Sequence, residues 1–286
     1  MKHSSFLVFL LIITALSIVT VTAQRPAERS PSREFCSDNN WSNDNQVSFH
    51  ELRQMTLPAT GSVAVDAGKN GGIHIKGTNR SDVLVRACVQ AWGTSDEAAK
   101  ALASSIKISE GSEIRADSST GDSHWSVSYD ISVPRNTDLK LNAHNGGISI
   151  DSVDGRLDFE TMNGGVSLRD VSGDVKGKTT NGGVRVALSG ASWQGSGLDV
   201  QTTNGGVSLI IPESYAANIE TGTTNGGYKS DIPSLNITTE NVAGDMSRRR
   251  RGGSIKTALN GGGAPIRLVT TNGGIKIASS ETNEKY

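Results

Sequence analysis

The sequence predicts an all-β fold, and three observations support this class. Of the 286 residues, 33 are glycine and only 5% are aromatic, which is typical of short strands joined by tight turns. Apolar and polar residues alternate over much of the chain, as they do in half-buried strands. The triplet Asn-Gly-Gly recurs, in its central copies, every 18–23 residues, which is the length of a solenoid coil. We therefore predict a parallel β-solenoid, similar to a single-stranded β-helix, with about 18–23 residues per coil.

The first 23 residues have the composition of a signal peptide. A short polar start precedes an apolar stretch over residues 6–21, and Val21-Thr22-Ala23 offers small residues for cleavage before Gln24. A retained membrane anchor is the alternative, but the stretch is short for a span and no basic cluster follows it directly. We expect a secreted or periplasmic protein without a transmembrane span after cleavage.

A flexible arm is expected after the signal peptide. Residues 24–46 are rich in Pro, Ser, Arg and Asn, and we take the arm as far as residue 55, with the solenoid domain over 56–286. The two cysteines, Cys36 and Cys88, would pair in an oxidising compartment and tie the arm to the domain. Two separate buried thiols are the alternative. Neither cysteine has a CxxC partner, so a zinc or redox role is not expected.

One helix interrupts the early strands. Residues 61–93 alternate apolar and polar side chains in three short runs, and SDEAAKALASSIKI then predicts a helix near 95–106. Ser95 or Asp96 can cap it. Its apolar stripe is predicted to consist of Ala98, Ala101, Leu102 and Ile106. Strands resume at WSVSYDISVP.

The repeat is phased to its Asn. The residues three and five positions after the Asn are apolar in most copies, and the residue between them is polar, so the former point inward. Asn and Gly suit a tight corner, and stacked corners would place the Asn amides in a ladder. A meander of Asn-Gly hairpins is the alternative, but each repeat holds two strands and two unlike turns, which favours the coil. The predicted corners are Asn70, Asn145, Asn163, Asn181, Asn204, Asn225, Asn260 and Asn272, of which Asn225 and Asn260 precede irregular sequence.

Pairs of threonines precede four of these corners. Their hydroxyls form a candidate binding edge that could hydrogen-bond sugars, order water, or only satisfy neighbouring groups of the fold. The residues of this edge are Thr179, Thr180, Thr202, Thr203, Thr223, Thr224, Thr270 and Thr271.

No motif for catalysis, a cofactor or a metal is found. The sequence lacks GxSxG, HExxH and phosphate-binding GxxxxGK[ST] motifs, and its net charge of −1 gives no attraction for nucleic acid. The run DMSRRRRGGS is expected to be a solvated loop, with a polyanion-binding patch as the alternative; it contains Arg248, Arg249, Arg250 and Arg251. Carboxylates crowd two repeats and could serve a carbohydrate-active enzyme, although a solvated face is favoured. These are Asp151, Asp154, Asp158, Glu160, Asp170 and Asp174.

Four features together resemble the bacterial putative-adhesin family of secreted domains. They are strands ending in T-x-N-G-G-V/I, the YDISVP step, the Ile211-Pro212 turn and the closing GGG…IRLVTTNGGIKI, and they span roughly residues 56–280. The resemblance implies a β-solenoid and provides no catalytic residues. We therefore expect a non-catalytic binding or structural module at the cell envelope, with an unknown glycan or protein ligand. A polysaccharide lyase or hydrolase is the alternative.

Overall fold

A computed structural model of the chain describes residues 35–36, 46–121, 124–232, 235 and 252–283. Residues 1–34 form one unit and Phe35–Tyr286 a second, to which all described residues belong. The predicted signal peptide, most of the predicted arm and the four consecutive arginines lie outside the described residues.

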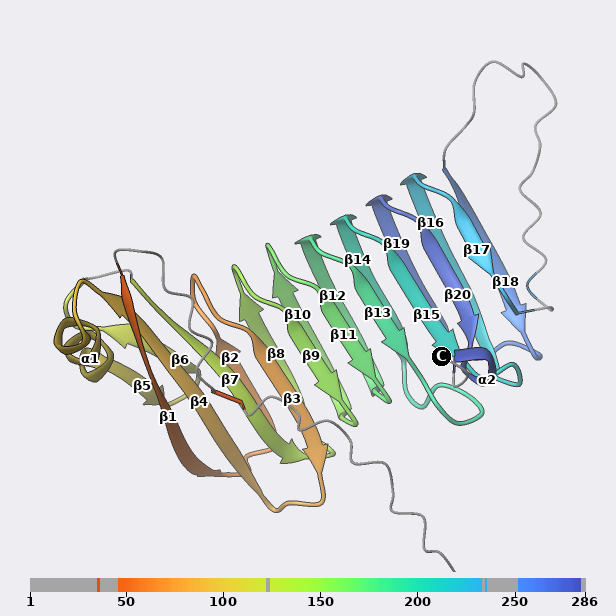
Figure 1. Cartoon of the computed structure of the whole chain (residues 1–286). Helices are drawn as coiled ribbons and strands as arrows, with labels where there is room; N and C mark the ends of the chain where they lie inside the picture. The colour runs from red at the N-terminus through yellow and green to blue at the C-terminus, as the bar shows by residue number, and fades with distance from the viewer. Residues whose placement is uncertain (1–34, 37–45, 122–123, 233–234, 236–251, 284–286) are drawn as a thin grey trace, which may run out of the picture. The chain divides into compact units, whose positions relative to one another are not determined.

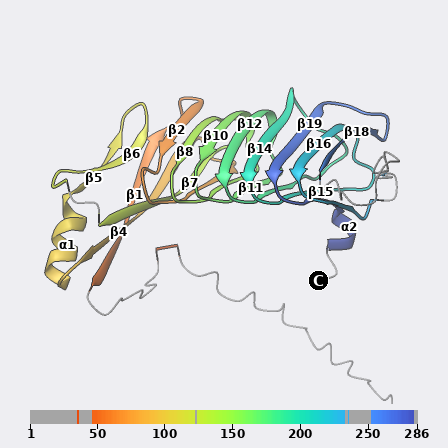
Figure 2. The same ribbon diagram turned by 90° about the horizontal axis from the view of Figure 1, so that it is seen from above.

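The second unit is nearly all-β and contains two ten-stranded sheets, which form two layers (Figures 1 and 2). We call them sheet A and sheet B. Sheet A has the order β1 (Val47–Pro58), β4 (Asp82–Gly93), β7 (Trp125–Pro134), β3 (Ile73–Thr78), β9 (Ile148–Asp151), β11 (Val166–Arg169), β13 (Val184–Ala187), β15 (Val207–Ile211), β20 (Ile275–Ser279) and β17 (Tyr228–Ser230). Sheet B has the order β18 (Gly253–Leu259), β16 (Ala217–Asn225), β19 (Pro265–Asn272), β14 (Gly197–Asn204), β12 (Ser172–Asn181), β10 (Asp154–Thr161), β8 (Asp138–Ala143), β2 (Ser62–Asp66), β6 (Ile114–Ser118) and β5 (Ile106–Glu110).

Most neighbouring strands are parallel. Antiparallel pairing is confined to the ends of the sheets, at β1–β4, β4–β7, β5–β6 and β16–β18. The described residues also include two helices, α1 (Asp96–Ser105) and α2 (Ser280–Asn283). The predicted all-β class with a short helix is therefore confirmed at this level, whereas α2 was not predicted.

Seven of the eight Asn-Gly-Gly triplets carry the chain from sheet B to sheet A; the exception is Asn260, which lies between two strands of sheet B. In the coil of Asn163, for example, β10 belongs to sheet B and β11 to sheet A. The residues at positions three and five after this Asn, Val166 and Leu168, are 2% and 0% exposed, and Ser167 between them is half-buried. The predicted inward phase is thus confirmed. Because strands joined by a corner lie in different sheets, the hairpin alternative is wrong, and the arrangement is consistent with a solenoid.

The coils do not stack in the order of the sequence. In sheet B, β14 pairs with β19, and β19 pairs with β16. In sheet A, β20 likewise lies between β15 and β17. The last coil is therefore inserted between the two that precede it (Figure 1). Asn204 and Asn225 therefore do not lie side by side, although they are consecutive corners in the sequence. The apolar pattern is the same in every coil and does not encode their order.

The predicted arm ends earlier than residue 55. Strand β1 begins at Val47 and pairs along its whole length with β4, from Val47 opposite Gly93 to Pro58 opposite Asp82. The polar composition that predicts an arm ends at about residue 46, and the segment VSFHELRQMTLP is instead paired backbone at the edge of sheet A. Extending the arm over residues 47–55 was therefore wrong.

Helix α1 begins as predicted, but a different face is buried. The Ser95 side chain accepts a hydrogen bond from the backbone N–H of Ala98, which is the expected N-cap. Among the predicted stripe, Ala98 and Ala101 are exposed. The buried positions follow helical spacing one residue later and are Ala99, Leu102, Ala103 and Ile106.

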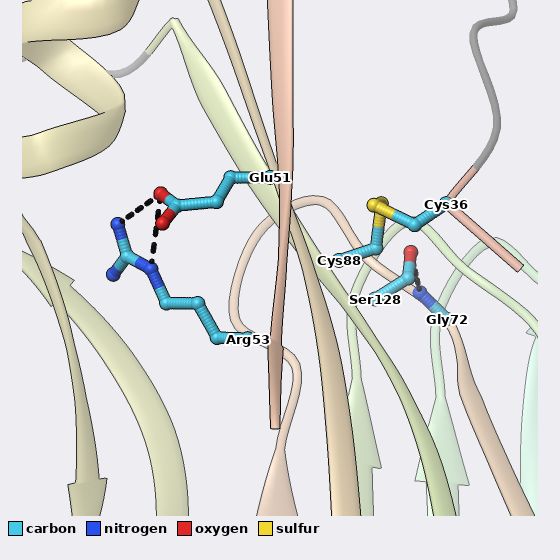
Figure 3. Close-up of a disulfide and its surroundings, with 6 residues drawn as sticks. All are labelled: Cys36, Glu51, Arg53, Gly72, Cys88 and Ser128. Carbon is cyan, nitrogen blue, oxygen red and sulfur yellow. Dashed lines mark hydrogen bonds and ion pairs between the residues drawn. A yellow bond between two sulfur atoms is a disulfide. The ribbon is translucent and has the colours of Figure 1, made fainter. Parts of the chain in front are cut away.

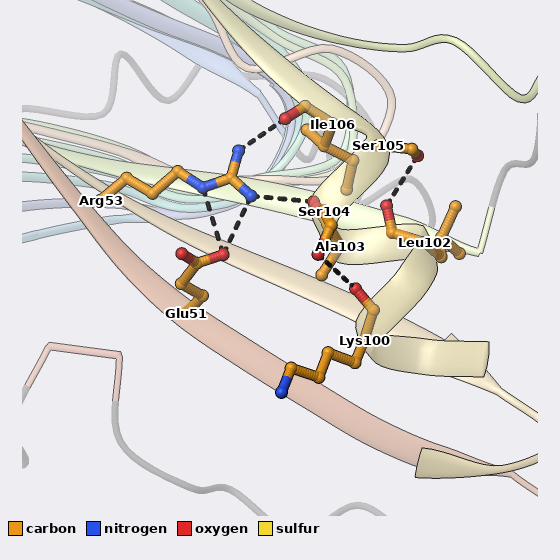
Figure 4. Close-up of polar contacts among 8 residues, drawn as sticks. All are labelled: Glu51, Arg53, Lys100, Leu102, Ala103, Ser104, Ser105 and Ile106. Carbon is orange, nitrogen blue, oxygen red and sulfur yellow. Dashed lines mark hydrogen bonds and ion pairs between the residues drawn. The ribbon is translucent and has the colours of Figure 1, made fainter. Parts of the chain in front are cut away.

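The C-terminal end of α1 is held by an arginine from β1. The Arg53 guanidinium donates to the carbonyl oxygens of Ala103 (2.8 Å) and Ile106 (2.5 Å) and pairs with Glu51 at 2.9 Å (Figure 4). A cation at this end complements the helix dipole, and Arg53 adds a second donor to the Ala103 carbonyl, which also accepts from the backbone N–H of Ile106.

Candidate binding surface at the Asn-Gly-Gly corners

Seven of the eight predicted corner Asn side chains form one continuous ladder. Six hydrogen bonds of 2.7–3.0 Å join them, each from the amide nitrogen of one Asn to the amide oxygen of its neighbour, with Asn70 as the acceptor at one end. In spatial order the ladder contains Asn70, Asn145, Asn163, Asn181, Asn204, Asn272 and Asn225. The hydrogen-bonding groups of these amides are largely used within the fold, so the ladder orients the corners.

Asn260 does not belong to the ladder, and its prediction as a repeat corner is wrong. Its backbone has a positive φ of 47°, and its amide donates to the carbonyl oxygens of Glu213 (2.8 Å) and Tyr215 (3.0 Å). These contacts fix the turn between β18 and β19, two strands of sheet B that lie on opposite sides of β16. The triplet resembles the others in sequence, but the missing apolar residues after it are the signal that it has another role.

The first threonine of each pair serves the fold. Its hydroxyl donates to a glycine carbonyl oxygen in the neighbouring coil at 2.7–2.8 Å, and its side chain is almost fully buried. The residues concerned are Thr179, Thr202, Thr223 and Thr270. These four candidate residues are therefore inaccessible to a ligand, because position −2 from the Asn points into the core.

The second threonine of each pair is exposed and lines a groove on sheet B. Across the strands these residues follow the order Thr180, Thr203, Thr271 and Thr224. Beside them lie Lys178, Gln201, Val269 and Gly222, each two residues earlier in its strand. We call this the threonine groove; its volume is about 430 Å³. The predicted binding edge did not include these residues at position −3 from each Asn, although they share a strand face with the threonines at position −1.

The carboxylates of residues 151–174 do not converge on one site. Asp151 lies on sheet A, whereas Asp158 and Glu160 lie on sheet B. Glu160 pairs with Lys178 at 3.0 Å, and Asp174 pairs with Lys176 at 3.3 Å. This placement on two sheets, with ion pairs to lysines, is a solvated charged surface and does not favour the carbohydrate-active alternative.

A polar cluster that the sequence did not predict lies beside the disulfide. Cys36 and Cys88 are joined by a disulfide, as predicted (Figure 3). The neighbouring residue Phe35 lies against sheet A. The Arg86 guanidinium lies 5.5 Å from the centre of the Phe35 ring and pairs with Asp130.

His74 also contacts Asp130, with Nδ1 3.2 Å from the carboxylate. Burial opposes ionisation of Asp130, but the hydrogen bond from His74 and the charge of Arg86 outweigh it and keep the pKa of this carboxyl below its usual value. The cluster therefore holds a charged carboxylate beside Phe35.

Metal and membrane features are not evident in the described part of the chain. Among those residues, no group of three or more His, Cys, Asp or Glu side chains could hold a metal ion. No helix within the described ranges is long and apolar enough to cross a bilayer.

Comparison with known proteins identifies the family. The model of the family described as Toastrack DUF4097 matches residues 95–278. The chain belongs to the Toastrack DUF4097 family. No curated protein matches it.

Two solved structures cover 81% of this Toastrack chain each. One is a putative cell adhesion protein from Clostridium sporogenes ATCC 15579, covered over its whole length, with 11% identity and a TM-score of 0.40. The other is a putative adhesin from Bacteroides fragilis NCTC 9343, of which 97% is covered, with 7% identity and a TM-score of 0.33.

Proposed function

We propose that this Toastrack protein is secreted or periplasmic and acts as a non-catalytic binding module at the cell envelope. Its fold is a β-solenoid over residues 56–286, which β1 extends at its start. The signal-peptide composition of residues 1–23 supports export, and the Cys36–Cys88 disulfide suits an oxidising compartment. The alternation of strands between two parallel sheets supports the solenoid.

The observation that carries the proposal is the threonine groove. Four exposed hydroxyls stand on neighbouring strands, about 4.8 Å apart, beside the amide of Gln201 and the ammonium of Lys178. The groove has the size of small-molecule sites and offers both donors and acceptors without a buried nucleophile. Such a surface suits a hydroxyl-rich ligand, either a glycan or a polar protein segment.

A binding panel with matched variants tests this role. The purified protein is incubated with immobilised neutral glycans, envelope fragments and envelope proteins. The double variant Thr203→Val, Thr271→Val removes two hydroxyls and keeps the shape of the side chains. Thr56→Val, an exposed threonine on the distant strand β1, is the control.

Binding that is lost in the double variant and kept in the control is the expected result. Absence of binding across the panel, or equal binding by all three proteins, would contradict the proposal. Turnover of a polysaccharide that is lost in Asp158→Asn and Glu160→Gln would instead establish the carbohydrate-active alternative.

A further inference from the structure

A second row of side chains crosses the outer face of sheet A. It consists of the residues four positions after each ladder Asn, which stand opposite one another on neighbouring parallel strands. We call it the sheet A row; in spatial order it contains His74, Ser149, Ser167, Arg185, Ser208, Lys276 and Lys229. With strands about 4.8 Å apart, its six steps extend over roughly 29 Å.

The surface beside this row is hollowed at both ends. A cavity of about 570 Å³ is lined by His74, Ser149 and Ser167 and is bordered by Phe35. A second cavity, of about 470 Å³, is lined by Ser208, Lys229 and Lys276. In both, the second glycine of each corner also contributes to the lining. The two cavities lie at the two ends of the row, and β13 with Arg185 stands between them and lines neither. We call the row together with its two cavities the trough.

The second glycines are less strictly required by the fold than the first ones, although a Cβ would lie only 3.3 Å from a neighbouring carbonyl oxygen at Gly72 and 3.0 Å at Gly147. A Cβ on the first glycine Gly182 would lie 2.0 Å from the Gly164 carbonyl oxygen, which backbone packing forbids. A Cβ on the second glycine Gly206 would lie 3.4 Å from its nearest neighbour, and one on Gly227 would meet nothing within 4 Å. Neither second glycine has a φ in the left-handed region. Close packing of neighbouring corners accounts for glycine at Gly72 and Gly147. At Gly206 and Gly227, where there is room for a Cβ, glycine still costs backbone entropy, and an unobstructed surface beside the row is a reason to keep it.

The trough is positively charged at its C-terminal half. Arg185, Lys276 and Lys229 are exposed, and none of them pairs with a carboxylate in the described part of the chain. Asp231, close to Lys229 in the sequence, instead accepts a hydrogen bond from the backbone N–H of Ser279 at 2.8 Å. Charged residues on sheet B, by contrast, lie beside partners of opposite sign. The unpaired cations of the trough are thus complementary to an anionic ligand.

We propose that the trough binds a linear acidic polysaccharide, laid across the strands of sheet A. Its acidic groups contact Arg185, Lys276 and Lys229, and its hydroxyls hydrogen-bond the serines of the row. The second glycines leave space for sugar rings close to the backbone, and Phe35 offers an aromatic face at the end of the first cavity.

Other anionic polymers fit this surface less well. Single-stranded nucleic acid is held by successive exposed aromatic side chains on which bases stack. The linings of the two cavities contain three aromatic residues, Phe35, Tyr129 and Tyr228, and Tyr129 is only 1% exposed, so they do not form such a series. A membrane surface is bound by apolar side chains that stand exposed beside basic ones. The apolar residues Ile73, Ile148 and Val166, which line the first cavity, are instead at most 2% exposed. The proposal concerns a different sheet from the threonine groove and does not rest on the function proposed there.

Titration with acidic polysaccharides tests the proposal. Alginate, polygalacturonate and chondroitin sulfate are titrated into the purified protein by calorimetry, with dextran as a neutral polymer and double-stranded DNA and polyphosphate as non-sugar polyanions. The triple variant Arg185→Gln, Lys229→Gln, Lys276→Gln removes the three cations. The control Lys100→Gln, Lys107→Gln removes two exposed lysines elsewhere.

At least one acidic polysaccharide is expected to bind, about tenfold more weakly to the triple variant, since each exposed ion pair contributes a fraction of a kcal/mol. Thermal unfolding of the triple variant should match that of the wild type. The control and the Thr203→Val, Thr271→Val variant should bind as the wild type does, which separates this site from the threonine groove. Absence of binding to all three polysaccharides, unchanged binding by the triple variant, or equally tight binding of DNA or polyphosphate would overturn the proposal.

Discussion

Reversing the charge of Arg267 is expected to destabilise the protein, because this side chain lies between two carboxylates on sheet B. Its guanidinium is 2.7 Å from Asp199 on one neighbouring strand and 3.7 Å from Glu220 on the other. Both contacts belong to a row in which every charge alternates in sign from strand to strand. In spatial order this row contains Lys140, Asp158, Lys176, Asp199, Arg267, Glu220 and Lys256.

The size of the effect follows from exposed electrostatics. The three side chains are 35–40% exposed, so a water-like dielectric applies. Two unit charges about 5 Å apart then interact by about 0.8 kcal/mol, which physiological salt reduces by roughly half. Arg267→Glu removes two attractions and adds two repulsions. Four contributions of about 0.4 kcal/mol lower the free energy of unfolding by about 1.5 kcal/mol, or the melting temperature by about 3–6 °C.

Thermal unfolding followed by circular dichroism at low and high salt measures this effect. The matched control is Lys276→Glu, which makes the same charge change in the same coil, but on sheet A beside Ser208 and Lys229. We expect a loss of stability only for the Arg267 variant, and a smaller loss at high salt. Equal destabilisation by both variants, or a loss of stability that salt does not change, would refute the claim that the alternating charges of this row stabilise the protein.

Three further predictions concern the core and the corners. Thr221 is fully buried and its hydroxyl has no hydrogen-bond partner, so Thr221→Val should raise the free energy of unfolding by up to about 1 kcal/mol in urea titrations. Thr202→Val, which loses the hydrogen bond to the Gly182 carbonyl, should lower it by a similar amount. Gly182→Ala should cost about 3 kcal/mol in the same assay because its Cβ would overlap a backbone carbonyl, but Gly183→Ala, with 3.4 Å to its nearest neighbour, should cost about 1 kcal/mol or less. The pKa of Asp130 is lowered in the folded protein. The stability that this carboxylate contributes is therefore present above the unfolded pKa of about 3.9 and is lost as pH falls through the folded pKa. The melting temperature of Asp130→Asn should thus drop less steeply below pH 4 than that of the wild type.

The parts of the fold that depend on local chemistry could be predicted from the sequence. Within a coil, alternation after the Asn determines which residues face the core, and Val184 and Val186 are 2% and 0% exposed as this phase requires. The helix start at Ser95 and the ladder of Asn amides follow from equally local preferences. The pairing of Cys36 with Cys88 was expected because the chain offers no other partner.

The candidate site was predicted only in part, because two adjacent threonines of a strand face opposite ways. Thr202 lies in the core and bonds the Gly182 carbonyl, whereas Thr203 lines the groove. Periodicity alone would have separated them. The contributions of Gln201 and Val269 depend on which coils are neighbours, which no property of a single coil determines.

The order of the coils is the main feature that local patterns do not encode. The charged row of sheet B distinguishes the observed order from stacking in the order of the sequence. Every coil presents the same apolar positions to its neighbours, so β14 could pair with β16 or with β19 at little difference in core packing. Stacking in sequence order would place Asp199 beside Glu220, two like charges on adjacent strands. Inserting the last coil places Arg267 between them and restores an alternating row that continues to Lys256 on β18. Cross-strand charge pairs are each small, but like charges directly opposite are destabilising, so the row favours the observed order over the sequential one.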